Sequence, residues 1–365
     1  MPVKQEPCSE RIIVMMKLQN ATPYDPLAPW NVSESDYPFS AETWEKLSFC
    51  LNYAVLAPSS HNSQPWRFKL GLDELRLYAD RTRALPIVDP HDRELIISCG
   101  AALFHLRLAI RYFGHNDQVF LFPEGTDPDL LAVTEVGIPR ALESDERAMF
   151  HAIPRRHTNR HPFESRPVPD HLLASLRTAA DKEGAVFTLI SDEKLKRRAV
   201  ELVWHADRAQ MADRSFRREL AAWIHSGRSA TRDGIPGYAQ GLKELLDFAT
   251  PAYAAAVRTF DLGKGIAAHN RKLVEGSPAL GVLTTETDTP SDWLLVGQAL
   301  ARVLLLACAS GVSASFLNQP IEVEELRPQF REALGLSGFP QLFLRMGYGP
   351  EVKPTPRRDV REVLI

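Results

Sequence analysis

Cysteine is scarce in this 365-residue chain, and its spacing matches neither a metal site nor a disulfide framework. The four cysteines, Cys8, Cys50, Cys99 and Cys308, lie far apart and form no CxxC pair or Cys/His cluster. This pattern argues against a zinc site and against a disulfide-stabilised scaffold. We therefore expect a reducing, cytoplasmic environment and no bound metal.

Long hydrophobic runs are missing as well. The apolar run at residues 12–16 is too short for the core of a signal peptide. The most apolar later stretch, residues 297–312, is interrupted by Arg302 and falls short of the roughly 20 residues that a membrane-spanning helix needs. The sequence therefore predicts a soluble protein without a membrane partner.

The chain also lacks a large excess of either charge. It has 43 Lys and Arg against 46 Asp and Glu, which gives a formal charge of -3. Such a balance provides no field that would gather nucleic acid, so no nucleic-acid partner is expected. With 44% apolar and 24% charged residues, the composition is that of a globular protein of one large or two ordinary domains.

Several common enzyme motifs are absent from the sequence. No GxGxxG follows a strand-like segment, and the GYG at residues 347–349 lacks the third glycine, so a Rossmann dinucleotide site is not predicted. There is also no Walker loop, no GxSxG elbow and no HExxH pair. These absences leave other signals to define the function.

The clearest of those signals is an internal repeat. GAALFHLRLAIRYFG begins at Gly100, and GQALARVLLLACASG begins at Gly297. Each copy is apolar nearly all round, which is typical of a buried helix, and each ends in a glycine, Gly114 or Gly311, that suits a helix C-cap. We expect the two helices to pack near a pseudo-two-fold axis.

The segments around the two copies also repeat. An amphipathic helix at residues 44–57 or 170–180 leads to a strand-like run, WRFKL or AVFTLI. A further strand-like run, LLAVTEVG or QLFLRMGYG, follows each buried helix and ends in glycine. Residues 140–153 are predicted to form a connecting helix that Pro154 closes. The sequence thus predicts an α+β fold of two similar halves, residues 1–150 and 151–365.

The second half carries an extra segment of helical and turn-rich sequence at about residues 200–285. It could be added helical bulk. A lid over a ligand is the favoured interpretation, because long insertions in compact domains are often functional.

The densest local motif is APSSHNSQPWRF, residues 57–68, where hydroxyl and amide side chains crowd one loop. Such a loop can bind the edge of a heterocycle or a phosphate, although an isolated motif of this kind is usually a solvated turn. Trp66 at its end is interpreted as core packing.

Two basic motifs lie in the second half. PRRHTNRHPF, residues 154–163, mixes arginines with a threonine hydroxyl, and PTPRRD near the C-terminus adds Arg357 and Arg358. A charge run is usually a solvated face. Guanidinium groups with a nearby hydroxyl nevertheless suit the bidentate geometry of a phosphate.

Together these motifs resemble the flavin-dependent nitroreductase family, and specifically its acg-type tandem members, over most of the chain. In that family a PSxxNxQPW loop from one subunit faces an Arg-x-Ser/Thr-x-basic motif and a C-terminal Arg from the other. PSSHNSQPW and RHTNR are similar to these two motifs. The resemblance implies a nitroreductase-like fold of two fused halves, an intramolecular pseudo-dimer whose further association it leaves open.

The resemblance also implies which residues bind the flavin. They are Pro58, Ser59, Ser60, Asn62 and Gln64 in the first half, and Arg156, His157, Thr158 and Arg160 in the second, with Arg357 or Arg358 at the C-terminal basic position. Each half lacks the motif that the other retains, so we expect one composite site and one FMN per chain. Arg160 is the candidate stabiliser of the reduced flavin, and a donor to flavin N5 is expected within residues 315–322.

The implied activity is FMN-dependent hydride transfer from NAD(P)H to a small acceptor, a nitroaromatic or a quinone, with no obligatory catalytic side chain. The rival hypothesis is a protein that stores or sequesters FMN under a lid without turnover. Another flavin reaction on the same scaffold is a weaker third option.

Overall fold

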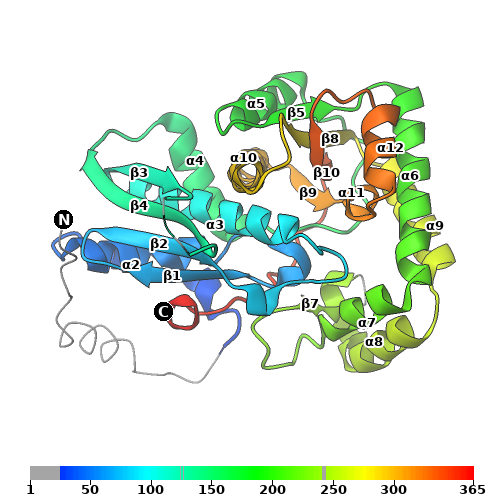
Figure 1. Cartoon of the computed structure of the whole chain (residues 1–365), viewed down its shortest axis with the longest axis horizontal. Coiled ribbons are helices and arrows are strands. Elements are labelled where there is room, and N and C mark those ends of the chain that lie inside the picture. Colours follow the sequence, from blue (N-terminus) through cyan, green and yellow to red (C-terminus); the bar gives the residue numbers. More distant parts are fainter. Residues whose placement is uncertain (1–24, 124, 126, 241–243) are drawn as a thin grey trace.

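The computed structural model describes residues 25–123, 125, 127–240 and 244–365. Cys8 and the apolar run at residues 12–16 therefore lie outside the described residues. Two four-stranded antiparallel sheets lie on either side of a central pair of helices (Figure 1). The α+β class that the sequence predicts is confirmed.

The first sheet has the strand order β1-β2-β4-β3. Its strands are β1 (Trp66–Leu70), β2 (Glu74–Ala79), β3 (His115–Leu121) and β4 (Leu130–Pro139). The predicted strands WRFKL and LLAVTEVG correspond to β1 and to most of β4. Trp66, interpreted from sequence as core, is fully buried.

The second sheet has the strand order β5-β8-β10-β9. Its strands are β5 (Val186–Leu189), β8 (Ala279–Thr285), β9 (Ser313–Phe316) and β10 (Phe339–Gly347). If the strands of each sheet are numbered along the chain, both sheets have the same order, 1-2-4-3. The long helix also occupies the same place in both, between the second and third strands.

These long helices are α3 (Arg93–Tyr112) and α10 (Pro290–Ala309), and they cross at the two glycines of the repeat. A Cβ atom added at Gly100 would lie 2.3 Å from the carbonyl oxygen of Leu294, and one added at Gly297 would lie 2.1 Å from that of Ile97. The glycines therefore mark the contact between the helices and not their beginnings, which lie seven residues earlier in both copies.

The ends of α3 and α10 match the sequence prediction. Gly114 and Gly311 follow the two helices with φ angles of +93° and +75°, the left-handed conformation that a C-cap glycine supplies. By length and composition both helices could span a membrane, but 83% and 67% of their most apolar windows are buried inside the protein. Packing within the chain accounts for their apolar surfaces.

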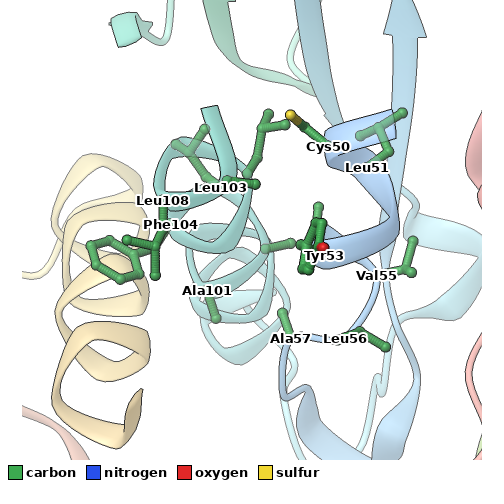
Figure 2. Close-up of a cluster of buried hydrophobic side chains, with 14 of the residues drawn as sticks. Cys50, Leu51, Tyr53, Val55, Leu56, Ala57, Ala101, Leu103, Phe104 and Leu108 are labelled. Atoms are coloured by element: carbon green, nitrogen blue, oxygen red, sulfur yellow. The ribbon is translucent and has the colours of Figure 1, made fainter. Parts of the chain in front are cut away.

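The core of the first half lies between α3 and α2 (Thr43–Ala54). Figure 2 shows Cys50, Leu51 and Tyr53 of α2 beside Leu103 of α3, while Phe104 points toward α10. In the second half, α5 (Asp170–Asp181) packs against α10 and β5. Each half thus buries its own sheet and shares the α3–α10 contact.

The insertion extends between β5 and β8. Its helices are α6 (Glu193–Ala212), α7 (Arg214–Ala222), α8 (Thr250–Thr259) and α9 (Gly263–Glu275), and its two short strands are β6 (Ile224–His225) and β7 (Ile235–Pro236). The predicted end at residue 285 is too late, because the aliphatic run at its end forms β8 of the central sheet. The predicted start falls inside α6.

The remaining helices connect the sheets or follow them. They are α4 (Ser144–Ala152), α11 (Gln319–Glu322), α12 (Leu326–Ala333) and α13 (Val360–Val363). The predicted connecting helix corresponds to α4, although it begins four residues later than residue 140, and Pro154 lies within a short 3-10 turn after it. The C-terminal segment ends beside β1, where the Ile365 N–H donates to the Phe68 carbonyl at 2.9 Å.

Candidate functional site

The loop between α2 and β1 has an unusual backbone. His61, Asn62 and Gln64 have φ angles of +52°, +56° and +53°, a region that side-chain-bearing residues seldom adopt. The hydroxyl of Ser59 accepts the Gln64 N–H at 2.9 Å, which helps to hold this conformation. Such strained backbone persists only where surrounding contacts fix it, and it is common at functional sites.

Asn62 joins three distant segments. Its amide nitrogen donates to the carbonyls of Gly234 and Pro356, both at 3.0 Å, and its amide oxygen accepts from Nη1 of Arg357 at 2.6 Å. Gly234 belongs to the insertion, and Pro356 and Arg357 belong to the PTPRRD segment. The loop is therefore fixed to the insertion and to the C-terminal segment by one buried side chain.

Gln64 makes a second set of such contacts. Its side-chain nitrogen donates to the Arg232 carbonyl at 2.7 Å, and its oxygen accepts the Arg358 N–H at 2.8 Å. In this structure Asn62 and Gln64 thus use their polar groups on the protein itself. Their observed role is to position the C-terminal arginines.

Ser60 faces the N-terminal part of α3. Its hydroxyl donates to the carboxylate of Glu94, which also accepts from Arg93 at 3.1 Å and from Asn318 at 3.3 Å. Asn318 lies in the 315–322 segment, where the sequence predicts a donor. Ser60 and this segment therefore meet at one buried carboxylate.

Arg156 is the least satisfied charged residue of the site. Its side chain is buried, and among the residues that the structure describes its Nε has no hydrogen-bond partner. Burial lowers its pKa to about 10. A buried cation without a hydrogen-bonded anion is costly.

Arg357 lies in the same positive field. Its guanidinium carbon is 4.7 Å from the ring centroid of Trp30, which in turn lies 4.6 Å from the ring of His157. Its Nε has no partner within the described ranges. Burial and the charge of Arg156 hold the pKa of Arg357 well below its usual range. The two arginines thus repel each other in the absence of an anion.

Arg358 differs from its neighbour. Its guanidinium group donates to the carbonyls of Gln64 at 3.0 Å and Glu362 at 2.7 Å, and it lies 3.6 Å from the carboxylate of Asp80. These contacts satisfy the group internally. Of the two arginines that the sequence left open, only Arg357 lies beside Arg156 with an unpaired nitrogen.

Arg160 is half-buried and lies near His61 of the 58–66 loop. Its one recorded hydrogen bond is a 3.3 Å contact from Nη1 to the Ala239 carbonyl of the insertion. Burial lowers the pKa of Arg160, and burial together with this arginine lowers the pKa of His61 to about 4. A neutral imidazole and an almost unpaired guanidinium thus lie near each other.

The segment that carries these side chains is attached to the second sheet. Thr158 forms an isolated parallel bridge with Ala314, and the Asn159 N–H donates to the Ala314 carbonyl at 3.0 Å. Because Ala314 lies in β9, the basic motif extends the edge of that sheet. Pro58, at the start of the loop, is buried.

Three residues of this region were not predicted from the sequence. They are Trp30, which stacks on Arg357, His105, which lies near Arg156 and Arg357, and Glu94, which binds Ser60. Both His105 and Glu94 lie in α3. His105 is a polar residue inside the apolar repeat, which was a usable signal, whereas Glu94 follows the polar residues 91–93 and gave no such signal. Nothing in the local sequence pointed to Trp30.

Comparison with known proteins gives close relatives over nearly the whole chain. Rv3131 of Mycobacterium tuberculosis strain H37Rv, named as an NAD(P)H nitroreductase, is 32% identical over 327 residues, which cover 88% of this chain and 91% of that protein. Acg of the same strain, also named as an NAD(P)H nitroreductase, is 29% identical over 335 residues, 89% of this chain and 97% of that protein.

Comparison with solved structures gives more distant matches. The FMN-dependent nitroreductase NfnB from Mycobacterium smegmatis, solved in complex with NADPH, has 17% identity and a TM-score of 0.39, over 59% of this chain and 96% of that one. No family model matches the chain.

Proposed function

The chain belongs to the NAD(P)H nitroreductase family, and on that basis we propose that it binds one FMN and passes a hydride from NAD(P)H through the flavin to a nitroaromatic or quinone. The hydride chemistry is supplied by the flavin when it is bound, so no side-chain acid or nucleophile is required. The observation that carries the proposal is the buried pair Arg156 and Arg357, which no carboxylate neutralises within the described residues.

The phosphate of FMN fits this pair. It carries a charge of about -1.5 to -2 at neutral pH and has several acceptor oxygens. The unpaired Nε atoms of Arg156 and Arg357 are donors of the kind that a phosphate requires. The side chains of His157 and Thr158, beside Arg156, complete the proposed phosphate end.

Arg160 is proposed to stabilise the negative charge of the reduced flavin. The support is its partial burial, its single long backbone contact and the neutral His61 nearby. A cation in such surroundings acts on a neighbouring anion with little screening by solvent. If this role is correct, Arg160→Ala shifts the flavin potential toward harder reduction; an unchanged potential would contradict it.

The site is proposed to be composite and single. Residues 1–150 supply the 58–66 loop, and residues 151–365 supply the arginines, in line with the shared strand order of the two sheets. Ser59, Ser60, Asn62 and Gln64 are proposed to hold the flavin site in shape, directly or through the groups that they bind. Titration of the flavin-free protein is expected to saturate at one FMN per chain, and saturation at two would contradict this.

FMN storage is the second candidate, and the insertion favours it. The Gly234 N–H donates to the Asn62 carbonyl at 3.3 Å, Arg160 donates to Ala239, and the Tyr238 hydroxyl donates to the Pro354 carbonyl at 2.6 Å. Residues 232–239 therefore contact all three motifs. A segment held in this way could cover a bound flavin and keep NAD(P)H away from it.

One experiment separates turnover from storage. The yellow protein is mixed anaerobically with NADH or NADPH, the flavin absorbance is followed, and a nitroaromatic is then added. Bleaching that recovers on addition of the nitroaromatic supports the reductase. A flavin that stays oxidised supports storage, and a protein that binds no FMN contradicts both.

A further inference from the structure

His105 is a buried histidine with one unused nitrogen. Its side chain lies on α3 and has no exposed surface. Nδ1 is 3.2 Å from the carbonyl oxygen of Tyr53, and Nε2, within the part of the chain that the structure describes, has no hydrogen-bond partner. Because a carbonyl only accepts, Nδ1 must carry the proton. Nε2 of the neutral ring is then a bare acceptor.

The charged groups that face His105 are the two unneutralised arginines. Arg156 comes from the turn after α4, and Arg357 comes from the C-terminal segment. Titratable groups that act on these arginines are the His157 imidazole and the Cys308 thiol, both beside Arg156, and the Tyr238 hydroxyl of the insertion, beside Arg357. Burial and the two arginines lower the pKa of His105 to about 3, so the ring is neutral when the site holds no anion.

An arriving phosphate changes this situation. A phosphate oxygen of the dianion carries no hydrogen, so it cannot pair with the bare Nε2. Moving the ring proton from Nδ1 to Nε2 would turn a lone pair toward the Tyr53 carbonyl and lose that hydrogen bond. Only an added proton lets Nε2 and a phosphate oxygen attract each other while Nδ1 keeps its partner.

We propose that the site takes up one proton together with the phosphate group and holds it between Nε2 of His105 and a phosphate oxygen. The proton comes from solvent, and no bond is broken elsewhere. Two guanidinium groups repel a proton from this ring, whereas a dianion placed among them attracts one. His105 would thereby act as a third donor to the phosphate. This inference rests on the proposed binding of FMN.

The consequence is a distinctive pH dependence of affinity. Free FMN is mostly a dianion above about pH 6, so above that pH the complex binds one proton more than its separated components. The association constant should therefore fall about tenfold for each pH unit between 7 and 8.5. Riboflavin, which lacks the phosphate, should show no such slope.

The test is an equilibrium titration of the flavin-free full chain with FMN or riboflavin at constant ionic strength across this pH range. Wild type is expected to show the tenfold slope with FMN only, and His105→Gln is expected to lose it. His151→Gln, a matched change at an exposed histidine of α4, should keep the slope. A slope that survives in His105→Gln would assign the proton to another group, such as Arg357, and overturn the proposal.

A second measurement covers a variant that fails to fold. In 15N-histidine-labelled wild type, one imidazole should be protonated on both nitrogens with FMN bound and on one nitrogen with riboflavin bound. If no histidine changes its protonation, the proposal is wrong. If FMN binds with an affinity that does not depend on pH, the proton proposal is wrong but the proposed function stands. If FMN does not bind at any pH, the proposed function is wrong as well.

Discussion

Equivalent residues of the two long helices lie in different electrostatic surroundings. His105 of α3 and Arg302 of α10 each lie five residues after the glycine at the helix crossing. On the α3 side, His105 lies near Arg156 and Arg357, which have no carboxylate partner in the described residues. On the α10 side, Arg302 donates hydrogen bonds to two carboxylates.

The α10 side is a closed ion-pair network. Arg302 donates to Glu183 at 3.0 Å and to Asp145 at 3.3 Å, and Glu183 also accepts from Arg107 at 2.8 Å. Arg107 in turn pairs with Asp117 at 2.7 Å. Here the protein neutralises its own buried charge, whereas on the α3 side it leaves positive charge for a ligand. The difference favours one anion site per chain despite two similar halves.

Replacing Glu183 should disrupt the ion-pair network beside α10 and cause the largest loss of stability among the changes considered. Glu183→Gln keeps the shape but removes the negative charge that Arg302 and Arg107 share, and it places an amide NH2 against one of the two guanidinium groups. We expect a loss of roughly 3 kcal/mol in the free energy of unfolding, the lower part of the range for breaking a buried pair, because Asp145 and Asp117 remain. Denaturant unfolding measures this.

The control for that change is Glu275→Gln, which removes the exposed partner of Arg271, 2.9 Å away. It should cost less than about 0.5 kcal/mol. FMN affinity should be unchanged in both variants. Equal stability of the Glu183 and Glu275 variants would show that the network does not stabilise the fold.

The helix crossing is common to both sides, and Gly100→Ala disturbs it. The added Cβ would lie 2.3 Å from a backbone oxygen of α10, so the helices must move apart. We expect a loss of roughly 2 kcal/mol, in the range for overpacking. The control is Gly265→Ala in α9, where a Cβ meets nothing within 4 Å. That change should be neutral or stabilising by about 0.5 kcal/mol, and a Gly100→Ala variant as stable as this control would contradict the close crossing.

Arg156→Gln changes the side of the molecule where the arginines have no carboxylate partner. Unlike Glu183→Gln, it should weaken FMN binding without lowering the stability of the fold. It should weaken FMN binding by about tenfold to thirtyfold, the effect of losing one charge-assisted hydrogen bond, as measured by flavin titration. The flavin-free protein should be no less stable, because the removed charge had no partner. Arg155→Gln, one residue earlier and exposed, should bind FMN like wild type. Equal affinities for the two variants would be evidence against the arginine pair as the phosphate site.

The smallest change is Asn62→Ala, which releases Arg357 without removing a charge. It should weaken FMN binding by about threefold to tenfold, less than the loss of Arg156, because Arg357 keeps its charge and its hydrogen bonds to Thr355 and Pro356. The matched change is Asn52→Ala in α2, where the amide only caps the Phe49 carbonyl. That variant should leave FMN affinity unchanged, and an equal loss in both would point to a general effect on the fold.

Local pattern predicted much of this architecture. The two buried helices, their C-cap glycines, the strands β1, β4, β5 and β10 and the family were all accessible from periodicity and motifs. Strands β2, β3, β8 and β9 were not identified. β8 is buried along its whole length and β9 is a four-residue edge strand, so neither has a distinctive period. β2 and β3 alternate in burial, and their period could have been recognised. The helix starts were missed because Gly100 and Gly297 resemble helix boundaries in the sequence, whereas in the structure they allow the two helices to pack closely.

Hydrogen bonds and ion pairs between residues far apart in sequence could not be predicted from local patterns. Arg357 and Arg358 are adjacent and chemically identical, and only the positions of Gln64, Glu362 and Asp80 separate their roles. Likewise, nothing local distinguishes Glu183, which closes one charge network, from other acidic residues at helix ends. Whether a buried charge is satisfied depends on residues far away in sequence.

The hydrogen bond between Asn62 and Arg357 joins residues 295 positions apart. Contacts of such long sequence separation form late in folding, because the intervening chain must first be ordered. Both sheets and most helices can therefore be native-like before the site exists. Flavin retention should accordingly report complete folding more stringently than helical circular dichroism, and a refolding chain should regain its helices before its yellow colour.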